Sequence, residues 1–186
     1  IAVMGGRVIP FFTARATGTE KALPLPWLER IALASLWLIL LLWLVLPTQW
    51  VLGIQMFPLY IVAAGAHLYR QLRWRPGTTV AQPLLWSLHL AYLFIPLGLT
   101  ALAARTAGWP IALSLASHLF SAGSMGAMIL GMIARVSLGH SGRALQIGRR
   151  ITAAFALVIL SALLRVLLPL FWPNLTLTGW NLSGWS

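Results

Sequence analysis

The sequence predicts an all-α protein, a polytopic transmembrane helical bundle with about five complete spans plus the end of an upstream span. Hydrophobic residues make up 60% of the chain and charged residues only 8%, a balance that soluble domains of this length do not show. Apolar runs of about 20 residues, long enough to cross a bilayer, recur along the chain. Lysine and arginine fall in the short segments between those runs, as in membrane proteins. Residues 1–186 are therefore expected to form one transmembrane domain.

The start of the chain, residues 1–12, is predicted to be the end of a span that begins upstream. Gly5, Gly6 and Pro10 are expected to break its helix, and residues 13–26 then form a loop. Because the sequence begins inside an apolar run without a methionine or a signal-peptide pattern, it is expected to be a piece of a longer protein.

Five complete spans are expected to follow, with boundaries set mainly by prolines. Pro47 is expected to end the first span, and Thr48 to cap the second. Pro58 and Pro96 are kink candidates in the second and third spans, and Pro110 occupies the first turn of the fourth. The predicted spans are residues 27–46, 49–72, 83–104, 109–135 and 148–171.

The charges of the linkers predict the orientation of the bundle. Nearly all lysines and arginines outside the spans lie in residues 13–26, 70–82 and 135–150. Since cytoplasmic loops are enriched in these residues, the three linkers are expected to face the cytoplasm and the Trp-rich tail, 172–186, the opposite side. The formal charge of +11 is explained in this way, so the expected partner is the lipid bilayer and not nucleic acid.

Composition also limits the chemistry of this chain. It has no cysteine, which excludes disulfides, thiolate metal sites and iron–sulfur clusters. The two acidic residues, Glu20 and Glu29, lie near the edge of the first complete span. Paired-carboxylate catalysis and carboxylate proton relays are therefore not expected. A transition metal would have to use histidine, methionine, carboxylate or backbone oxygen.

The fourth predicted span carries two patterns at helical spacing. Gly123, Ala127 and Gly131 recur every four residues and predict a face of small residues that lets a neighbouring helix approach closely. A second stripe combines a histidine with a hydroxyl and thioethers. It contains His118, Ser121, Met125, Met128 and Met132.

The histidines His67, His89, His118 and His140 are the candidate metal ligands. His67 and His89 lie on consecutive antiparallel spans and are expected at similar depth near the cytoplasmic side. His118 is expected in the outer half of the membrane and His140 in a cytoplasmic loop. An imidazole inside the hydrocarbon region is costly without a partner, and metal ligation would supply one.

Two kinds of metal site suit these histidines. A haem needs an axial imidazole, an apolar slot and cations for its propionates, and the small residues at 63–66 would let a flat macrocycle approach His67. Copper would use two or three imidazoles, or an imidazole with the thioether of Met125 or Met128. Arg165, near the outer end of the last span, is a further candidate partner for a propionate. The predicted cofactor-binding residues are Arg7, Met125, Arg135 and Arg143.

Structural roles explain the same residues without a cofactor. His67 would extend to the interface beside Arg70, His89 would bond a backbone carbonyl, and His140 would be an ordinary loop residue. The methionines would fill the core, and Arg165 would extend outward to water.

Three blocks of sequence resemble the NnrS family. They are GGRVIPFFT at 5–13, PLLWSLHLAYLFIPLG at 83–98 and SHLFSAGSMGAMILGMIARVSLGHSGR at 117–143, in the same order as in that family. Ser141 stands where the family pattern has threonine, which keeps the hydroxyl.

The resemblance implies a haem- and copper-containing protein of the bacterial inner membrane, linked to nitric-oxide tolerance, of which this chain is the C-terminal part. It places His89, His118 and His140 within family-matching blocks, without assigning a metal to each. Its implied partners are nitric oxide and the remaining part of the parent protein, whose first half carries a WHxHE-type element that is absent here.

Three function classes remain open from the sequence. The first is binding of nitric oxide at a metal centre, for tolerance or for turnover; the scarcity of carboxylates favours binding or protection, because reduction needs protons. The second is a transporter or carrier component, suggested by Pro58, Pro96 and the Gly-rich fourth span. The third is a structural membrane subunit whose histidines serve packing alone.

Overall fold

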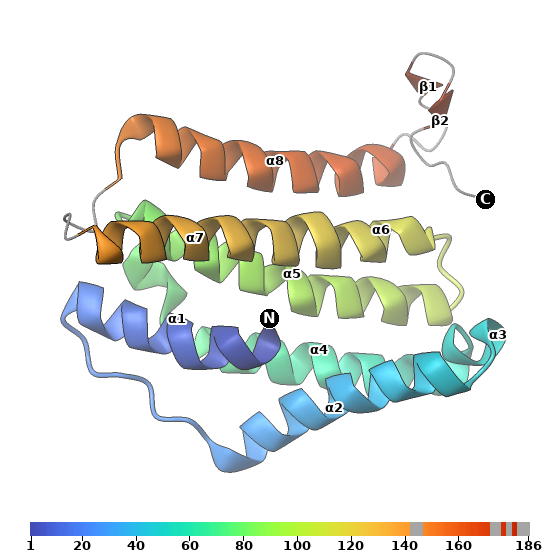
Figure 1. The fold of residues 1–186 in the computed structure, drawn as a ribbon. Helices are drawn as coiled ribbons and strands as arrows, with labels where there is room; N and C mark the ends of the chain where they lie inside the picture. The colour runs from blue at the N-terminus through green and yellow to red at the C-terminus, as the bar shows by residue number, and fades with distance from the viewer. Residues whose placement is uncertain (142–146, 172–175, 178–179, 182–186) are drawn as a thin grey trace.

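The computed structural model is a bundle of helices whose long axes run in roughly the same direction, with α2 tilted against the rest (Figure 1). It describes residues 1–141, 147–171, 176–177 and 180–181. The elements are α1 (Ala2–Thr17), α2 (Pro26–Val45), α3 (Thr48–Val51), η1 (Ile54–Met56), α4 (Phe57–Leu72), η2 (Pro76–Thr79), α5 (Pro83–Thr106), α6 (Leu113–His118), η3 (Leu119–Gly126), α7 (Ala127–His140), α8 (Arg149–Phe171), β1 (Thr176–Leu177) and β2 (Trp180–Asn181).

The described part of the chain contains four helices that are long and apolar enough to cross a membrane. They are α2, α5, the continuous run from α6 to α7, and α8, and they match four of the five predicted spans. Of their most apolar stretches, that of α5 is 67% buried and those of α2 and α8 are each 22% buried. The helix α5 contacts α1, α4, η3, α7 and α8, so it forms the centre of the bundle.

The predicted span at 49–72 is broken in the structure. Gly53 has an extended backbone, with φ −81° and ψ 162°, and α4 begins only at Phe57. Pro58 therefore starts a helix and does not kink one, because a proline in the first turn lacks only a hydrogen bond that the turn would not make. Thr48 provides no side-chain cap, so that prediction was wrong. The 16 residues of α4 span about 24 Å at 1.5 Å per residue, less than the hydrocarbon thickness of about 30 Å.

The first helix, α1, is longer than predicted. It passes through Gly5, Gly6 and Pro10 and ends at Thr17, so the predicted break was wrong. Packing overrides the low helix propensity of glycine and proline, because Ile9 in the same segment is completely buried.

The fourth predicted span starts and ends later than expected. Its helix begins at Leu113, after Pro110, and continues past Arg135 to His140. Its middle segment, η3, is a π-helix, whose wider turns shift the register of the residues on either side. The predicted thioether stripe is split as a result, since Met125 is 48% exposed while Met128 is 5% exposed.

The predicted face of small residues packs against α5. A Cβ built on Gly123 would lie 2.5 Å from Cγ of Phe94, and one on Gly131 would lie 2.9 Å from Cδ2 of Leu88. Ala127, between them, is also buried. The close approach expected for these residues is therefore present.

Two short strands in the tail, β1 and β2, pair antiparallel, with Thr176 opposite Asn181.

We expect labelling of single cysteines to report the predicted orientation. The chain has no cysteine of its own, and Thr78, Ser141 and Thr48 are all exposed. A membrane-impermeant maleimide should label Thr78→Cys and Ser141→Cys from the cytoplasmic side and Thr48→Cys from the opposite side. The reverse labelling would show that the basic linkers face outward.

Candidate functional site

A partly buried ion pair joins α2 to α4. Nε of Arg70 donates to Oε1 of Glu29 at 2.7 Å, and its Nη2 donates to the second carboxylate oxygen. Arg70 is only 2% exposed. Both partners lie near the predicted cytoplasmic side, where Arg70 occupies the last turn of α4 and Glu29 the first turn of α2. The positive side chain of Arg70 therefore lies at the partially negative end of α4, and the negative side chain of Glu29 at the partially positive end of α2. Both placements are favourable.

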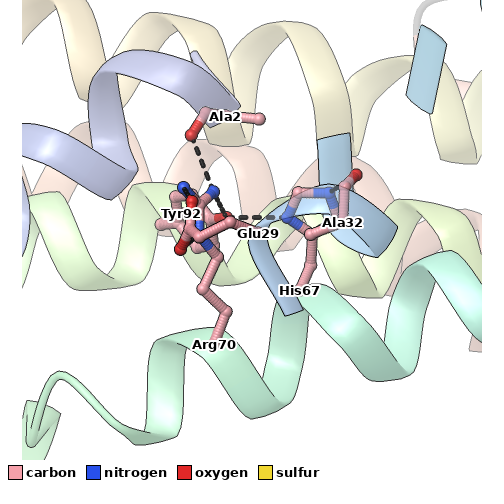
Figure 2. A network of polar contacts seen from close by, with 6 residues as sticks. All are labelled: Ala2, Glu29, Ala32, His67, Arg70 and Tyr92. Atoms are coloured by element: carbon pink, nitrogen blue, oxygen red, sulfur yellow. Dashed lines mark hydrogen bonds and ion pairs between the residues drawn. The ribbon is translucent and has the colours of Figure 1, made fainter. Parts of the chain in front are cut away.

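The same arginine starts a chain of hydrogen bonds that extends into the bundle (Figure 2). Its Nη1 donates to the Tyr92 hydroxyl and to the backbone oxygen of Ala2, each at 2.9 Å. Nδ1 of His67 lies 2.7 Å from the Tyr92 hydroxyl, and Nε2 of His67 lies 2.9 Å from the carbonyl oxygen of Ala32. Arg70, Tyr92 and His67 thereby connect α1, α2, α4 and α5.

The partners determine which nitrogen of His67 carries hydrogen. The carbonyl of Ala32 can only accept, so Nε2 carries the hydrogen and donates it. Nδ1 of the neutral ring is then an acceptor, and the hydroxyl of Tyr92 donates to it while accepting from Arg70. Each polar atom of the two rings thus has a partner in this arrangement. His67 does not extend to the interface, and to ligate a metal it would have to give up one of these bonds.

His89 is buried in a different way. Its Nε2 is hydrogen-bonded to Oγ1 of Thr13 at 3.0 Å, while its Nδ1 has no partner among the described residues. Gln71 donates from Nε2 to the backbone oxygen of His89 at 2.7 Å. The imidazole therefore bonds a hydroxyl rather than the backbone carbonyl that a structural role predicted, and one ring nitrogen remains available.

His118 lines a cavity of about 480 Å³ beside α8. Arg165 and Ser161 are the other polar residues of the wall, and the remaining wall is apolar. The apolar residues are Leu157, Leu160, Leu164, Leu168 and Pro169. Within the described residues, the side chain of His118 makes no hydrogen bond, and Arg165 is exposed. The structure thus brings together the histidine and arginine that the sequence placed in the outer half of the membrane.

The remaining predicted site residues are dispersed. His140 is the exposed last residue of α7 and not part of a loop, and Arg7 is exposed on α1. Met125 lines a separate, largely apolar cavity of about 450 Å³. Arg135 was expected at the water interface, but it is buried, with its guanidinium 3.6 Å from the ring centroid of Phe12. Arg143 lies outside the described residues.

The described residues contain no group of three or more His, Cys, Asp or Glu side chains placed to hold a metal ion. The residues that do assemble are Glu29, Arg70 and Tyr92 with His67, and of these the sequence analysis named only His67 as a site residue. One signal was present, because Glu29 is an acid at the edge of a span in a chain with few acids. Gly5 and Gly6 make the contact possible, since a Cβ on either would overlap Tyr92 or Arg70.

A bundle of apolar helices with buried, bonded polar side chains is the architecture of a polytopic helical membrane protein. The protein family described as "NnrS protein" matches residues 1–186, the whole sequence. The chain belongs to the NnrS family. Neither a curated protein nor a solved structure gives a significant match.

Proposed function

We propose that this chain carries a haem site of an NnrS-type protein of the bacterial inner membrane, which binds nitric oxide in the tolerance response. The observation that supports it is the cavity beside α8, where His118 and Arg165 share an otherwise mainly apolar wall. The predicted linkers at 13–26, 70–82 and 135–150 would face the cytoplasm, which places this cavity toward the opposite side.

The residues of the cavity fit the requirements of a haem. His118 is partly buried, and its side chain makes no hydrogen bond within the described residues, so it could ligate a haem iron without giving up an existing hydrogen bond. Arg165 would supply a cation for a haem propionate, and the leucines of α8 would provide the apolar part of the wall. When bound, a ferrous haem would supply direct ligation of nitric oxide, a gas that reaches the site through the membrane.

The donor set for copper is less complete. Met125 lines a different cavity from His118, which does not favour a pairing of that imidazole with the Met125 thioether. His89 is the better copper candidate of this chain, because its Nδ1 is buried without a partner. Further copper ligands would have to join it, since the described residues gather no group of three.

The structure weakens the argument for a transporter. Pro58 lies in the first turn of α4 and is not a kink within a span, which leaves Pro96, buried in the middle of α5, as the remaining kink candidate. We therefore favour a binding role over transport.

The haem proposal is tested by absorption spectra of the purified parent protein. We expect a Soret band that is lost in His118→Ala and retained in His140→Ala, a histidine of the same helix run that is exposed far from the cavity. Arg165→Gln should weaken haem retention about tenfold, the effect of losing one hydrogen bond to a charged group. A colourless wild-type protein, or a full Soret band in His118→Ala, would contradict the proposal.

The nitric-oxide part of the proposal has its own measurement. Titration of the dithionite-reduced protein with nitric oxide should shift the Soret band with a single saturating phase. If nitric oxide leaves the haem spectrum unchanged, the haem part of the proposal stands and the nitric-oxide part is contradicted.

A further inference from the structure

The side chain of Arg135 on α7 is a buried cation without an ionic partner. It is 5% exposed, and its Nε has no hydrogen-bond partner among the described residues. Its guanidinium stacks on the face of Phe12 on α1, and the guanidinium carbon lies 3.6 Å from the ring centroid. A guanidinium has five N–H donors, and a buried charge is normally paired and hydrogen-bonded.

The neighbouring groups do not supply the missing negative charge. The chain has two acidic residues, of which Glu29 is paired with Arg70 and Glu20 is exposed with no ion pair in the described residues. A second cation, Arg15, lies one turn beyond Phe12 on the same face of α1 and interacts electrostatically with Arg135. The carboxyl end of α1 offers only a partial negative charge. An external anion would satisfy both arginines.

The position of the two arginines indicates the class of anion. Arg15 lies in the last turn of α1, and Arg135 lies in the C-terminal half of α7, toward the end of the bundle where the basic linkers lie (Figure 1). Basic pockets between transmembrane helices on the cytoplasmic side bind phosphate head groups of anionic lipids. The planar donor fork of arginine matches the oxygens of a phosphate.

We propose that Arg135 and Arg15 form a phosphate-binding site between α7 and α1, whose ligand is the phosphate of an anionic phospholipid head group or free phosphate. Arg135 would hold the anion from within the bundle, and the exposed Arg15 would contact it from the surface. The site does not involve the proposed haem, because His118 ends α6, at the start of the helix run whose other end carries Arg135.

The experiment compares ligands on delipidated protein in a neutral detergent. Thermal unfolding and lipid retention in native mass spectrometry would be measured with phosphatidylglycerol, phosphatidylcholine and inorganic phosphate. We expect stabilisation by phosphatidylglycerol and none by phosphatidylcholine, whose head group has no net charge. If inorganic phosphate alone gives the same stabilisation, free phosphate is the ligand and the site stands.

Variants separate a built site from general attraction to a basic surface. Arg135→Gln should weaken phosphatidylglycerol binding tenfold or more, and the exposed Arg15→Gln a few-fold. Arg30→Gln, an exposed arginine near the start of α2, should bind like the wild type. If Arg135→Gln does not fold, Arg15→Gln still tests the site. Binding that is unchanged in both Arg135→Gln and Arg15→Gln, or equal for the two lipids, would overturn the proposal.

Discussion

Replacing Glu29 by glutamine is expected to lower the free energy of unfolding by about 3 kcal/mol, because it leaves Arg70 buried without its counter-ion. Removing one partner of a buried ion pair typically costs about 3–5 kcal/mol. We expect the lower end of this range, since 27% of the Glu29 side chain is exposed and water can compensate part of the loss. Arg70, which is 2% exposed, cannot move to solvent without breaking its bonds to Tyr92 and Ala2.

The measurement is reversible unfolding in mixed detergent micelles, followed by far-UV circular dichroism. Glu20→Gln is the matched control, because it removes the same charge from the other glutamate, which is exposed, and should change stability by less than about 0.5 kcal/mol. Equal stabilities of the two variants would show that Arg70 is not held by the ion pair.

The second large effect is expected from the close contact between η3 and α5. Gly123→Ala places a Cβ 2.5 Å from Cγ of Phe94, a distance that forces the ring or a helix to move. Phe94 is 3% exposed, so its ring has no free space to turn into. Overpacking of this kind costs about 1–3 kcal/mol, and a larger residue such as leucine should prevent assembly of the bundle.

Gly65→Ala is the matched control for this prediction. Gly65 also lies within a helix, but nothing lies within 4 Å of a Cβ built there. The change should stabilise the protein by about 0.5–1 kcal/mol, because alanine loses less backbone entropy than glycine. The same unfolding measurement compares both variants, and a Gly123→Ala protein as stable as wild type would mean that the two helices separate easily.

Features that depend on local sequence were predicted correctly, whereas features that depend on packing between distant segments were not. The apolar spans at 27–46, 83–104 and 148–171 were predicted within a few residues because hydropathy and length are local properties. The break at Gly53 and the continuation of α1 through Pro10 were not predicted, because the intrinsic helix propensity of a residue is weak compared with tertiary packing. The π-helix at 119–126 could not be predicted either, and it separated Met125 from Met128 in register.

The candidate site shows the same division. His118 and Arg165 were placed in the outer half of the membrane by counting residues along predicted helices, and they do line one cavity. Counting also placed His67 and His89 at similar depths, but it gave no information on their partners. His67 is fully hydrogen-bonded and His89 has one free nitrogen, which changes the ranking of the two as ligands.

The sequence by itself determined that this chain is a helical membrane protein of the NnrS family. Composition, the lengths of apolar runs and three sequence blocks carry that information without any contact between distant residues. Only the tertiary structure decided which polar groups meet, as in the pairing of Glu29 with Arg70 across 41 positions of sequence. The physical reason is that a buried charge needs a partner wherever it lies in the chain. Which residue becomes that partner depends on how the helices pack, and the sequence does not show this directly.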